Sequence, residues 1–193
     1  MYSTLKLLQV KPIDKITVRD ICDQCELTRN TFYYYFSDIY EVVEELLKFE
    51  TDKSLSEQQA FDSLYDEYLQ KYHLVLEYKN AVYHLYHSKN RDMILRYLYA
   101  ITDDFVEKYV RKEVRGHHLS EEDIRFITRF YSGSMVGSIL RWLQQGMKDS
   151  QEEIIYKMSM AYQATIQTLI QQIEASKKTN ECRPSPFPDG HGV

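Results

Sequence analysis

Glycine, proline and cysteine are scarce in this chain of 193 residues. It has only 6 glycines and 4 prolines, and three of the prolines lie at positions 184, 186 and 188. Because few residues would break a helix before that point, the composition predicts long helices and an all-α fold. The three cysteines, Cys22, Cys25 and Cys182, are too few and too odd in number for a disulfide framework. We therefore expect a reducing compartment.

Long apolar runs and catalytic motifs are also missing. No apolar run reaches the roughly 18 residues that suggest a membrane span, and the N-terminus has no basic region followed by an apolar segment. We therefore expect no membrane partner, no signal peptide and a cytoplasmic location. No phosphate loop, nucleophile motif or catalytic triad is evident, so we predict that the chain is not an enzyme. The net charge of −5 excludes a protein that simply coats nucleic acid, so any DNA contact must be local.

The first fifty residues have the pattern of short helices separated by tight turns. Met1 to Gln9 reads as a short helix before a break at Pro12. Thr17 is placed to cap a second helix, whose apolar stripe is Val18, Ile21, Cys22 and Cys25. Thr28 is placed to cap a third helix, over residues 28–35, and a fourth is expected from Ile39 to about Thr51. Two short helices joined by a tight turn make a helix-turn-helix.

The third helix ends in a cluster of aromatic residues, "TFYYYF". At 100° per residue, Phe32, Tyr35 and Phe36 point one way, and Asn30, Tyr33 and Tyr34 point the other. The first set is predicted to fill a core. The second set, with Arg29 and Thr31 in the first turn, suits contacts with base edges and phosphates in a DNA major groove. Packing of Tyr33 and Tyr34 on a neighbouring helix is the alternative.

The segment "ITVRDICDQCELTRNTFYYYF" resembles the DNA-binding signature of the TetR (tetracycline-repressor-like) family of bacterial transcriptional regulators, which are usually repressors. The resemblance implies helix caps and phosphate contacts at Thr17 and Thr28, and a base-reading turn at Arg29, Asn30 and Thr31. It also implies DNA contacts by aromatic residues. The predicted DNA-binding residues are Lys15, Thr17, Thr28, Arg29, Asn30, Thr31, Tyr33, Tyr34, Tyr35 and Lys48.

Two positions depart from the pattern of that family. Glu26 stands where the family usually has glycine in the turn, so Glu26 is expected to adopt a left-handed conformation at a cost of about 1 kcal/mol. Ile39 stands where many members have a lysine before the fourth helix, so one phosphate contact is missing. DNA binding is then expected to be weaker, or to depend more on Lys15 and Lys48.

The rest of the chain reads as longer helices and a tail. Helices are predicted at about 57–79, 80–88, 91–114, 120–146 and 151–176. The stretch "FYSGSMVGSILRWLQQGMKDSQEEI" looks like the late helices of one branch of the TetR family. The resemblance implies a helix-turn-helix DNA-binding domain over 1–50 and a helical effector-binding and dimerisation domain over 51–177. Residues 178–193 contain proline and glycine without apolar periodicity, which predicts a disordered tail.

Small residues one turn apart favour a close helix contact between two subunits. Glycine inside a helix lowers helix stability by about 1 kcal/mol relative to alanine, so close packing must offset this cost at Gly133 and Gly137. We prefer packing against a second subunit to burial within one subunit. The resemblance likewise implies that the last two helices of each subunit form a four-helix bundle. The predicted interface residues of the homodimer are Gly133, Ser134, Gly137, Leu140, Trp142, Met158, Tyr162 and Ile166.

Tyrosine is abundant, with 17 in the chain, and many lie between residues 61 and 109. Tyrosine combines an apolar ring with a hydroxyl group, which suits a pocket for a small aromatic or amphipathic effector. The predicted pocket residues are Tyr65, Tyr68, Tyr72, Tyr83, Tyr86, Tyr97 and Phe105. For any single tyrosine, replacement of Phe or Leu at a half-buried helix position is the simpler interpretation.

Metal binding is the less favoured interpretation at both candidate positions. His84 and His87 are three residues apart, but the sequence supplies no evident third ligand, so we predict no metal and no cofactor. Cys22 and Cys25 form a C-x-x-C motif on the apolar stripe of the second helix, which favours core packing over zinc or redox chemistry.

The sequence therefore predicts a homodimeric regulator that binds a palindromic double-stranded DNA operator and is released by a small-molecule effector. One alternative keeps DNA binding and replaces the effector with a protein partner or with none. A second alternative, which we favour less, is a helical enzyme with a vestigial helix-turn-helix.

Overall fold

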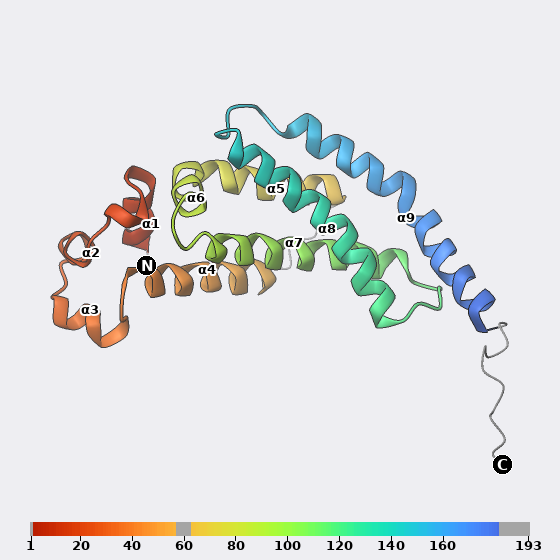
Figure 1. Cartoon of the computed structure of the whole chain (residues 1–193), viewed down its shortest axis with the longest axis horizontal. Coiled ribbons are helices and arrows are strands. Elements are labelled where there is room, and N and C mark those ends of the chain that lie inside the picture. The colour runs from red at the N-terminus through yellow and green to blue at the C-terminus, as the bar shows by residue number, and fades with distance from the viewer. Residues whose placement is uncertain (1, 57–62, 182–193) are drawn as a thin grey trace, which may run out of the picture.

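The computed structural model describes residues 2–56 and 63–181, and these residues are helical with short connections (Figure 1). The predicted all-α fold is confirmed. The elements are α1 (Tyr2–Val10), a 3-10 turn η1 (Ile13–Lys15), α2 (Val18–Cys25), α3 (Arg29–Tyr35), α4 (Ile39–Ser56), α5 (Leu64–Glu77), α6 (Lys79–Tyr86), α7 (Asp92–Glu113), α8 (Glu121–Gln144) and α9 (Glu152–Glu181). No helix among the described residues is long and apolar enough to cross a membrane.

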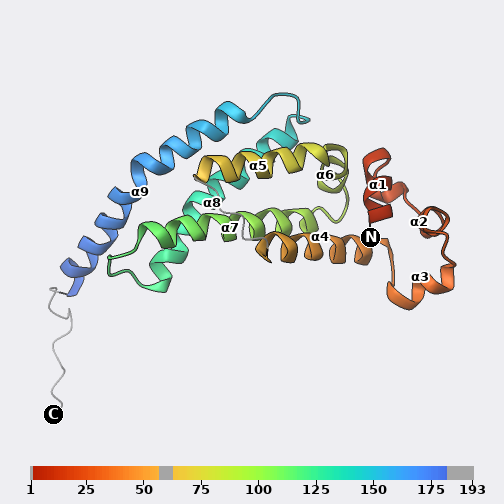
Figure 2. The ribbon, with the colours of Figure 1, turned by 180° about the vertical axis from the view of Figure 1, so that it is seen from behind.

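The molecule is elongated, and the short helices α1, α2 and α3 lie at one end. Helices α2 and α3 lie at that end, and the C-terminal half of α9 lies at the opposite end in both views (Figures 1 and 2). Helix α4 leaves the N-terminal end and runs beside α7, so it belongs physically to both parts of the molecule. Helix α1 packs on α6, which gives a second connection between the N-terminal helices and the longer helices.

Side-chain caps explain where several helices begin. The hydroxyl oxygen of Thr17 accepts a hydrogen bond from the backbone N–H of Asp20, and the Asp20 carboxylate accepts one from the backbone N–H of Thr17. Ser120 and Asp123 form the same reciprocal pair at the start of α8. These caps satisfy N–H groups that have no partner inside the helix. The predicted capping box at Thr17 is therefore confirmed.

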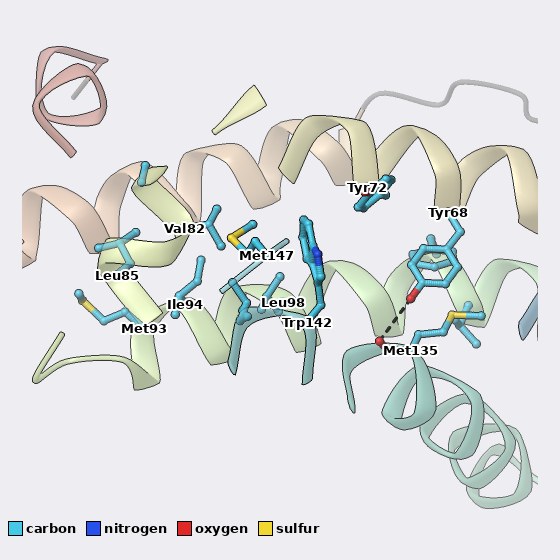
Figure 3. Close-up of a cluster of buried hydrophobic side chains, with 14 of the residues drawn as sticks. Tyr68, Tyr72, Val82, Leu85, Met93, Ile94, Leu98, Met135, Trp142 and Met147 are labelled. Atoms are coloured by element: carbon cyan, nitrogen blue, oxygen red, sulfur yellow. Dashed lines mark hydrogen bonds between the residues drawn. The ribbon is translucent and has the colours of Figure 1, made fainter. Parts of the chain in front are cut away.

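One continuous core of apolar side chains runs through the described residues. At the N-terminal end it includes Leu8, Ile21 and Phe32. In the long helices it includes side chains on both sides of the only tryptophan, Trp142, as Figure 3 shows with Val82 and Leu85 on one side and Tyr68 on the other. The Tyr68 hydroxyl donates a hydrogen bond to the backbone oxygen of Met135, 3.3 Å away, which satisfies a polar group inside this core.

Some predicted helix boundaries were wrong. Helix α4 continues to Ser56 rather than ending near Thr51, so the proposed division at residue 50 falls inside a helix. Helix α9 extends to Glu181, beyond the predicted end at 176 and into the segment predicted as a disordered tail. Helix α5 begins at Leu64, and residues 57–62, where the sequence predicts its first turns, lie outside the described residues, as do residues 182–193.

Candidate DNA-binding surface and effector cavities

Helix α3 is fixed in place by one capping residue and one buried ring. The hydroxyl oxygen of Thr28 accepts a hydrogen bond of 3.1 Å from the backbone N–H of Thr31, which starts the helix. Phe32 is only 5% exposed and packs edge-to-face with the ring of Tyr33, with 5.4 Å between ring centres. Phe32 is the one buried residue on this seven-residue helix, and apart from the half-buried Thr31 the remaining side chains are exposed.

The exposed side of α3 carries the aromatic residues and the polar first turn. Tyr33, Tyr34 and Tyr35 are 58%, 81% and 67% exposed, and Arg29 and Asn30 are also exposed. The helical-wheel prediction that Tyr35 points inward was wrong. Helix α3 packs mainly against α2, so its buried stripe is narrower than the predicted one and ends at Phe32 and the half-buried Phe36. The alternative that Tyr33 and Tyr34 pack on a neighbouring helix is contradicted by their exposure.

The turn between α2 and α3 uses a residue in the left-handed conformation. Glu26 has φ 55° and ψ 36°, and its backbone N–H donates to the carbonyl oxygen of Cys22. This confirms the expected conformation at the position where glycine would carry no steric cost. Cys22 is buried and Cys25 is half-buried against the core, and both are free thiols, as the packing interpretation predicts.

Polar contacts hold the helix-turn-helix against its neighbours. Lys11 lies 2.9 Å from the carboxylate of Asp20, and this ammonium group, together with the Thr17 cap, lowers the pKa of Asp20 to about 2. The Tyr40 hydroxyl donates a 2.7 Å hydrogen bond to Asp14, which links α4 to the turn before α2 and raises the pKa of Tyr40. The first contact ties α2 to the end of α1, and the second ties η1 to α4.

The two lysines predicted to contact DNA lie in different places. Lys15 is exposed at the end of η1, directly before α2, and Thr17 is exposed beside it. Lys48 lies on α4 about 14 Å along the helix axis from Ile39, at 1.5 Å per residue. It lines a shallow hollow with Arg96 and Tyr97 of α7. Lys48 is therefore not part of the α3 surface, because α4 carries it towards the middle of the molecule.

Two apolar cavities lie between the long helices. The first has a volume of about 30 Å³ and is lined by Tyr68, Tyr72, Phe105 and Trp142, among others. The second has a volume of about 80 Å³ and is lined by side chains of five helices, including Leu5 of α1 and Leu46 of α4. Pockets that hold drug-sized ligands have volumes of roughly 300 Å³ or more. Both cavities must therefore widen, or take a slender molecule.

Four of the seven predicted pocket residues line one or the other of these two cavities. Tyr68, Tyr72 and Phe105 line the first cavity, and Tyr97 lines the second. Burial raises the pKa of Tyr97 to about 12, so its hydroxyl stays neutral at physiological pH. The other three residues line neither cavity. Tyr65 packs edge-to-face on Tyr156, and Tyr83 and Tyr86 surround His87 on the outer side of α6.

Three of the residues predicted at the dimer interface belong to the core of a single chain. Trp142, Tyr162 and Ile166 are 2%, 3% and 3% exposed. The indole N–H of Trp142 donates to the backbone oxygen of Asp149, 2.8 Å away, and its ring lies 5.3 Å from that of Tyr72. Their predicted role in the interface is wrong, because side chains already enclosed by their own chain have no surface to offer a partner.

The other predicted interface residues keep part of their surface. Ser134 and Gly137 are exposed, while Gly133, Leu140 and Met158 are half-buried. A Cβ atom added to either glycine would meet no atom within 4 Å in this chain, so neither glycine is required by packing inside one protomer.

The sequence analysis did not single out the exposed apolar residues of α8 and α9. Phe126 and Phe130 are 55% and 59% exposed on α8, and Tyr156 and Met160 are 54% and 50% exposed on α9. Phe126 and Phe130 are four residues apart and therefore share one face of α8. Each phenylalanine directly precedes a buried residue, Ile127 or Tyr131, and therefore lies outside the buried stripe of α8. This offset was the signal that the sequence offered.

A polar connection between α1 and α6 was also missed. The Gln9 side-chain amide donates to the backbone oxygen of Glu77 at 2.8 Å, and its oxygen accepts from the backbone N–H of Ala81 at 3.1 Å. Nδ1 of His84 donates to the backbone oxygen of Leu8 at 2.7 Å. Nothing in the spacing of these residues signals a contact across more than sixty positions, so only the packed structure shows it.

No group of three or more His, Cys, Asp or Glu side chains with the geometry of a metal site occurs among residues 2–56 and 63–181. His84 and His87 each use Nδ1 for a hydrogen bond to a backbone oxygen, that of Leu8 and that of Tyr83 respectively.

The short α2, the tight turn at Glu26 and the exposed α3 define a helix-turn-helix DNA-binding protein. Comparison with protein families agrees with this class and extends it. Residues 3–46 match the model described as "Bacterial regulatory proteins, tetR family", and residues 62–164 match the TetR model described as "Transcriptional regulator C-terminal region". The chain belongs to the TetR family and is a DNA-binding transcriptional regulator.

Among solved structures, the chain is similar to one titled "Dihydroxyacetone kinase operon activator DhaS", with a TM-score of 0.69 and 17% sequence identity. The alignment covers 86% of this chain and 93% of that chain. At this identity the likeness shows a shared fold alone. The comparison with curated proteins gives no match. Members of the TetR family bind DNA operators, typically as dimers that respond to small molecules, and are generally not enzymes.

Proposed function

We propose that this chain acts as a homodimeric repressor in the cytoplasm, without enzymatic activity. Residues 1–50 bind DNA, and residues 51–177 bind the effector and form the dimer. The two copies of α3 enter successive major grooves of a palindromic operator, about 34 Å apart, and the bound dimer blocks polymerase.

The observation that carries this proposal is the exposure of the polar and aromatic side chains of α3 around one buried ring. Tyr34 is 81% exposed while Phe32, two residues earlier, is 5% exposed. Arg29 and Asn30, exposed in the first turn, are the side-chain types that hydrogen-bond guanine and adenine edges in the major groove. Tyrosine hydroxyls and the exposed Lys15 suit phosphate contacts.

The dimer is supported by the exposed apolar residues that α8 and α9 leave uncovered. Four large side chains, Phe126, Phe130, Tyr156 and Met160, are each about half exposed. Gly137 on the outside of α8 leaves open space where a second helix can approach closely. Burial of such residues between two protomers removes apolar surface from water.

Release by an effector is supported by the position of the larger cavity. Leu5 of α1 and Leu46 and Leu47 of α4 line it, together with residues of α5, α6 and α7. A molecule that widens this cavity must displace helices attached to the DNA-binding end, which changes the spacing of the two α3 helices. A ligand acts in this way only to the extent that it binds the widened state more tightly.

The small size of both cavities also favours a second candidate function. Volumes of about 30 and 80 Å³ do not admit a drug-sized molecule without rearrangement. A regulator with the same DNA-binding activity, but controlled by a protein partner or by no ligand, would need no larger cavity. The two candidates differ in whether a small molecule alters operator affinity.

The first test is binding of the purified protein to its own upstream DNA, followed by fluorescence anisotropy at several salt concentrations and compared with a scrambled duplex. We expect preference for one palindrome and a steep loss of affinity as salt rises, because phosphate contacts release counterions. Equal, weak binding to both duplexes would overturn the proposal. A screen of small molecules for loss of this binding then separates the two candidates.

The dimer is tested by sedimentation of Phe130→Glu, which places a charge on the exposed side of α8. We expect this variant to sediment as a monomer and to lose most operator affinity. Tyr99→Glu is the matched control, since Tyr99 is 42% exposed on α7, outside the proposed interface. If Phe130→Glu still sediments as a dimer, the proposed interface is contradicted.

A further inference from the structure

Gln9 of α1 forms two hydrogen bonds at the corner where α5 ends and α6 begins. Its Nε2 donates to the backbone oxygen of Glu77, the last residue of α5, at 2.8 Å. Its Oε1 accepts from the backbone N–H of Ala81, the third residue of α6, at 3.1 Å. Tyr78, which precedes α6, gives no side-chain cap to that helix. Gln9 therefore caps α6 from another helix, because a side-chain cap normally serves the second or third N–H group.

Two side chains of α6 bond the end of α1 in return. Asn80 Nδ2 donates to the backbone oxygen of Gln9 at 3.2 Å, and His84 Nδ1 donates to that of Leu8 at 2.7 Å. The Leu8 oxygen cannot bond the residue four positions later, since that residue is Pro12 and has no N–H group. We call the side chains of Gln9, Asn80 and His84 the α1–α6 latch. Their four hydrogen bonds satisfy backbone groups at the ends of three helices.

The latch is a second attachment of the N-terminal helices to the longer helices, besides α4. Helix α4 lies beside α7, whereas α1 lies beside α6 (Figures 1 and 2). Two packed helices can slide past each other by small steps. The contact of α4 with α7 would by itself leave the N-terminal helices free to turn about the axis of α4, and the latch limits this motion.

The orientation of α1 passes to α3 through α2. Nζ of Lys11, one residue beyond α1, lies 2.9 Å from the carboxylate of Asp20 on α2. Helix α3 packs mainly against α2, so it moves with α2. In a two-fold dimer both copies of α3 take the same orientation. This orientation fixes the distance and the rotation between the two half-sites that they contact.

We propose that the α1–α6 latch sets the half-site spacing of the operator. Gln9, Asn80 and His84 are positioning residues, which act through α1 and α2 rather than by contact with DNA. This inference rests on the proposed homodimer bound to a palindrome, and it adds the residues that restrict such a dimer to one spacing. It requires no effector, because the four hydrogen bonds belong to the chain itself.

The test uses the preferred palindrome with one or two base pairs added or removed at its centre, and measures binding by fluorescence anisotropy. Each added base pair moves the second half-site by about 3.4 Å and turns it by about 35°. We expect the wild type to bind the altered duplexes at least about tenfold more weakly, because the contacts of one half-site are lost. A duplex with a single half-site reports base reading without spacing.

Gln9→Met and His84→Leu each remove hydrogen bonds of the latch and keep apolar bulk. We expect the penalty for altered spacing to fall to about threefold or less in both variants, because α3 then samples several orientations. Binding to the single half-site should stay within about twofold of the wild type, since the base contacts are unchanged. His87→Leu is the matched control and should keep the wild-type penalty, because His87 bonds the oxygen of Tyr83 in α6 instead of α1.

Loss of stability and loss of the latch are separated by two further measurements. Ile127→Val weakens the core in α8, where Ile127 is 0% exposed, and should leave the spacing penalty unchanged. Hydrogen exchange of the Ala81 amide reports the latch directly, since Gln9 is its bonding partner. Gln9→Met should speed this exchange at least about tenfold, and His87→Leu should not. Unchanged exchange in Gln9→Met would overturn the proposal.

The outcomes distinguish this inference from the proposed function. If the wild type prefers one palindrome but binds the altered duplexes equally well, DNA recognition stands and the latch has no positioning role. The same follows if Gln9→Met and His84→Leu keep the full spacing penalty, or if they lose affinity for the single half-site as much as for the palindrome. If the wild type prefers no palindrome, the proposed function fails and this inference fails with it.

Discussion

The three tyrosines of α3 and two of the three tyrosines of α5, Tyr68 and Tyr72, are the same residue type in opposite surroundings. Tyr33, Tyr34 and Tyr35 have more than half of their surface exposed, whereas Tyr68 and Tyr72 are 3% and 6% exposed. The hydroxyls of Tyr68 and Tyr72 have backbone partners, that of Tyr68 on Met135 and that of Tyr72 on Gln151. Burial also raises the pKa of Tyr68. The first group is arranged for a partner and the second for the core.

This difference shows why residue type alone does not locate a binding surface. A short helix that packs against one neighbour can bury only a narrow stripe, so three consecutive tyrosines on α3 must project outward. Helix α5 contacts α6, α7 and α9, which together cover a wider part of its surface than α2 covers on α3. The number of neighbouring helices therefore decides whether a tyrosine is exposed.

The largest effect is expected from a substitution in the buried core around Tyr68. Phe105 is 1% exposed and packs against Tyr68, with 5.9 Å between ring centres. We expect Phe105→Ala to lower the free energy of unfolding by about 3–5 kcal/mol, measured by urea denaturation with circular dichroism. Tyr34→Ala is the control and should change it by no more than about 0.5 kcal/mol. A large loss in the control would mean that Tyr34 is a core residue.

The proposed role of the exposed α3 side chains is tested by measuring operator affinity. Asn30→Ala should weaken binding to the preferred palindrome by about 1–3 kcal/mol, because one base contact is lost, and should relax the preference at one base pair. Tyr34→Ala should weaken binding to all sequences alike. Both are measured by anisotropy, with Tyr99→Ala as a control outside α3. Unchanged affinity in Asn30→Ala would remove α3 from the proposed recognition role.

A smaller effect is expected in the turn that sets the angle between α2 and α3. Glu26 has φ 55°, so Glu26→Gly should raise the free energy of unfolding by about 1 kcal/mol or somewhat less, since glycine has no Cβ to clash but loses more backbone entropy. Met147 has the same φ but is buried, so Met147→Gly should be destabilising through lost packing. A destabilised Glu26→Gly variant would show that the Glu26 side chain has a stabilising role.

The smallest effect concerns the charge that anchors α2. The pKa of Asp20 is lowered to about 2, so the stability from its carboxylate is complete above its unfolded pKa of about 4 and is lost as pH falls towards 2. The difference in melting temperature between the wild type and Asp20→Asn should therefore shrink from pH 5 to pH 3. Asp23→Asn, with the same charge change on the same helix, should lower the melting temperature less at pH 7. If the difference in melting temperature does not vary with pH, the stabilisation does not come from the charge of the Asp20 carboxylate.

Much of the N-terminal end could be predicted from its sequence because its interactions are local. Capping at Thr17 and Thr28 involves residues three positions apart. The left-handed conformation at Glu26 was expected from the family resemblance, which places glycine at that position of the turn. The orientation of Tyr35 could not be predicted, because it depends on how many helices pack around α3. The position of Lys48 relative to α3 could not be predicted for a related reason, since the length and direction of α4 decide where it lies.

The positions of the longer helices along the chain could be predicted from the sequence. Which side of each helix stays exposed could be predicted less well. Apolar periodicity marks Trp142, Tyr162 and Ile166 as facing a helix, but it does not say whether that helix belongs to the same chain. The partly buried and exposed sides of α8 became distinguishable only once α7 and α9 were in place.

The sequence by itself determined the helical class, the helix-turn-helix with its caps, and the family resemblance, because each depends on residues within a few positions of one another. The tertiary structure alone decided which tyrosines face outward, which residues of α8 and α9 remain for a partner, and that Gln9 links α1 to α6. These features depend on contacts between segments tens of residues apart, and the free energy of burying apolar surface, rather than local helix propensity, selects among such contacts.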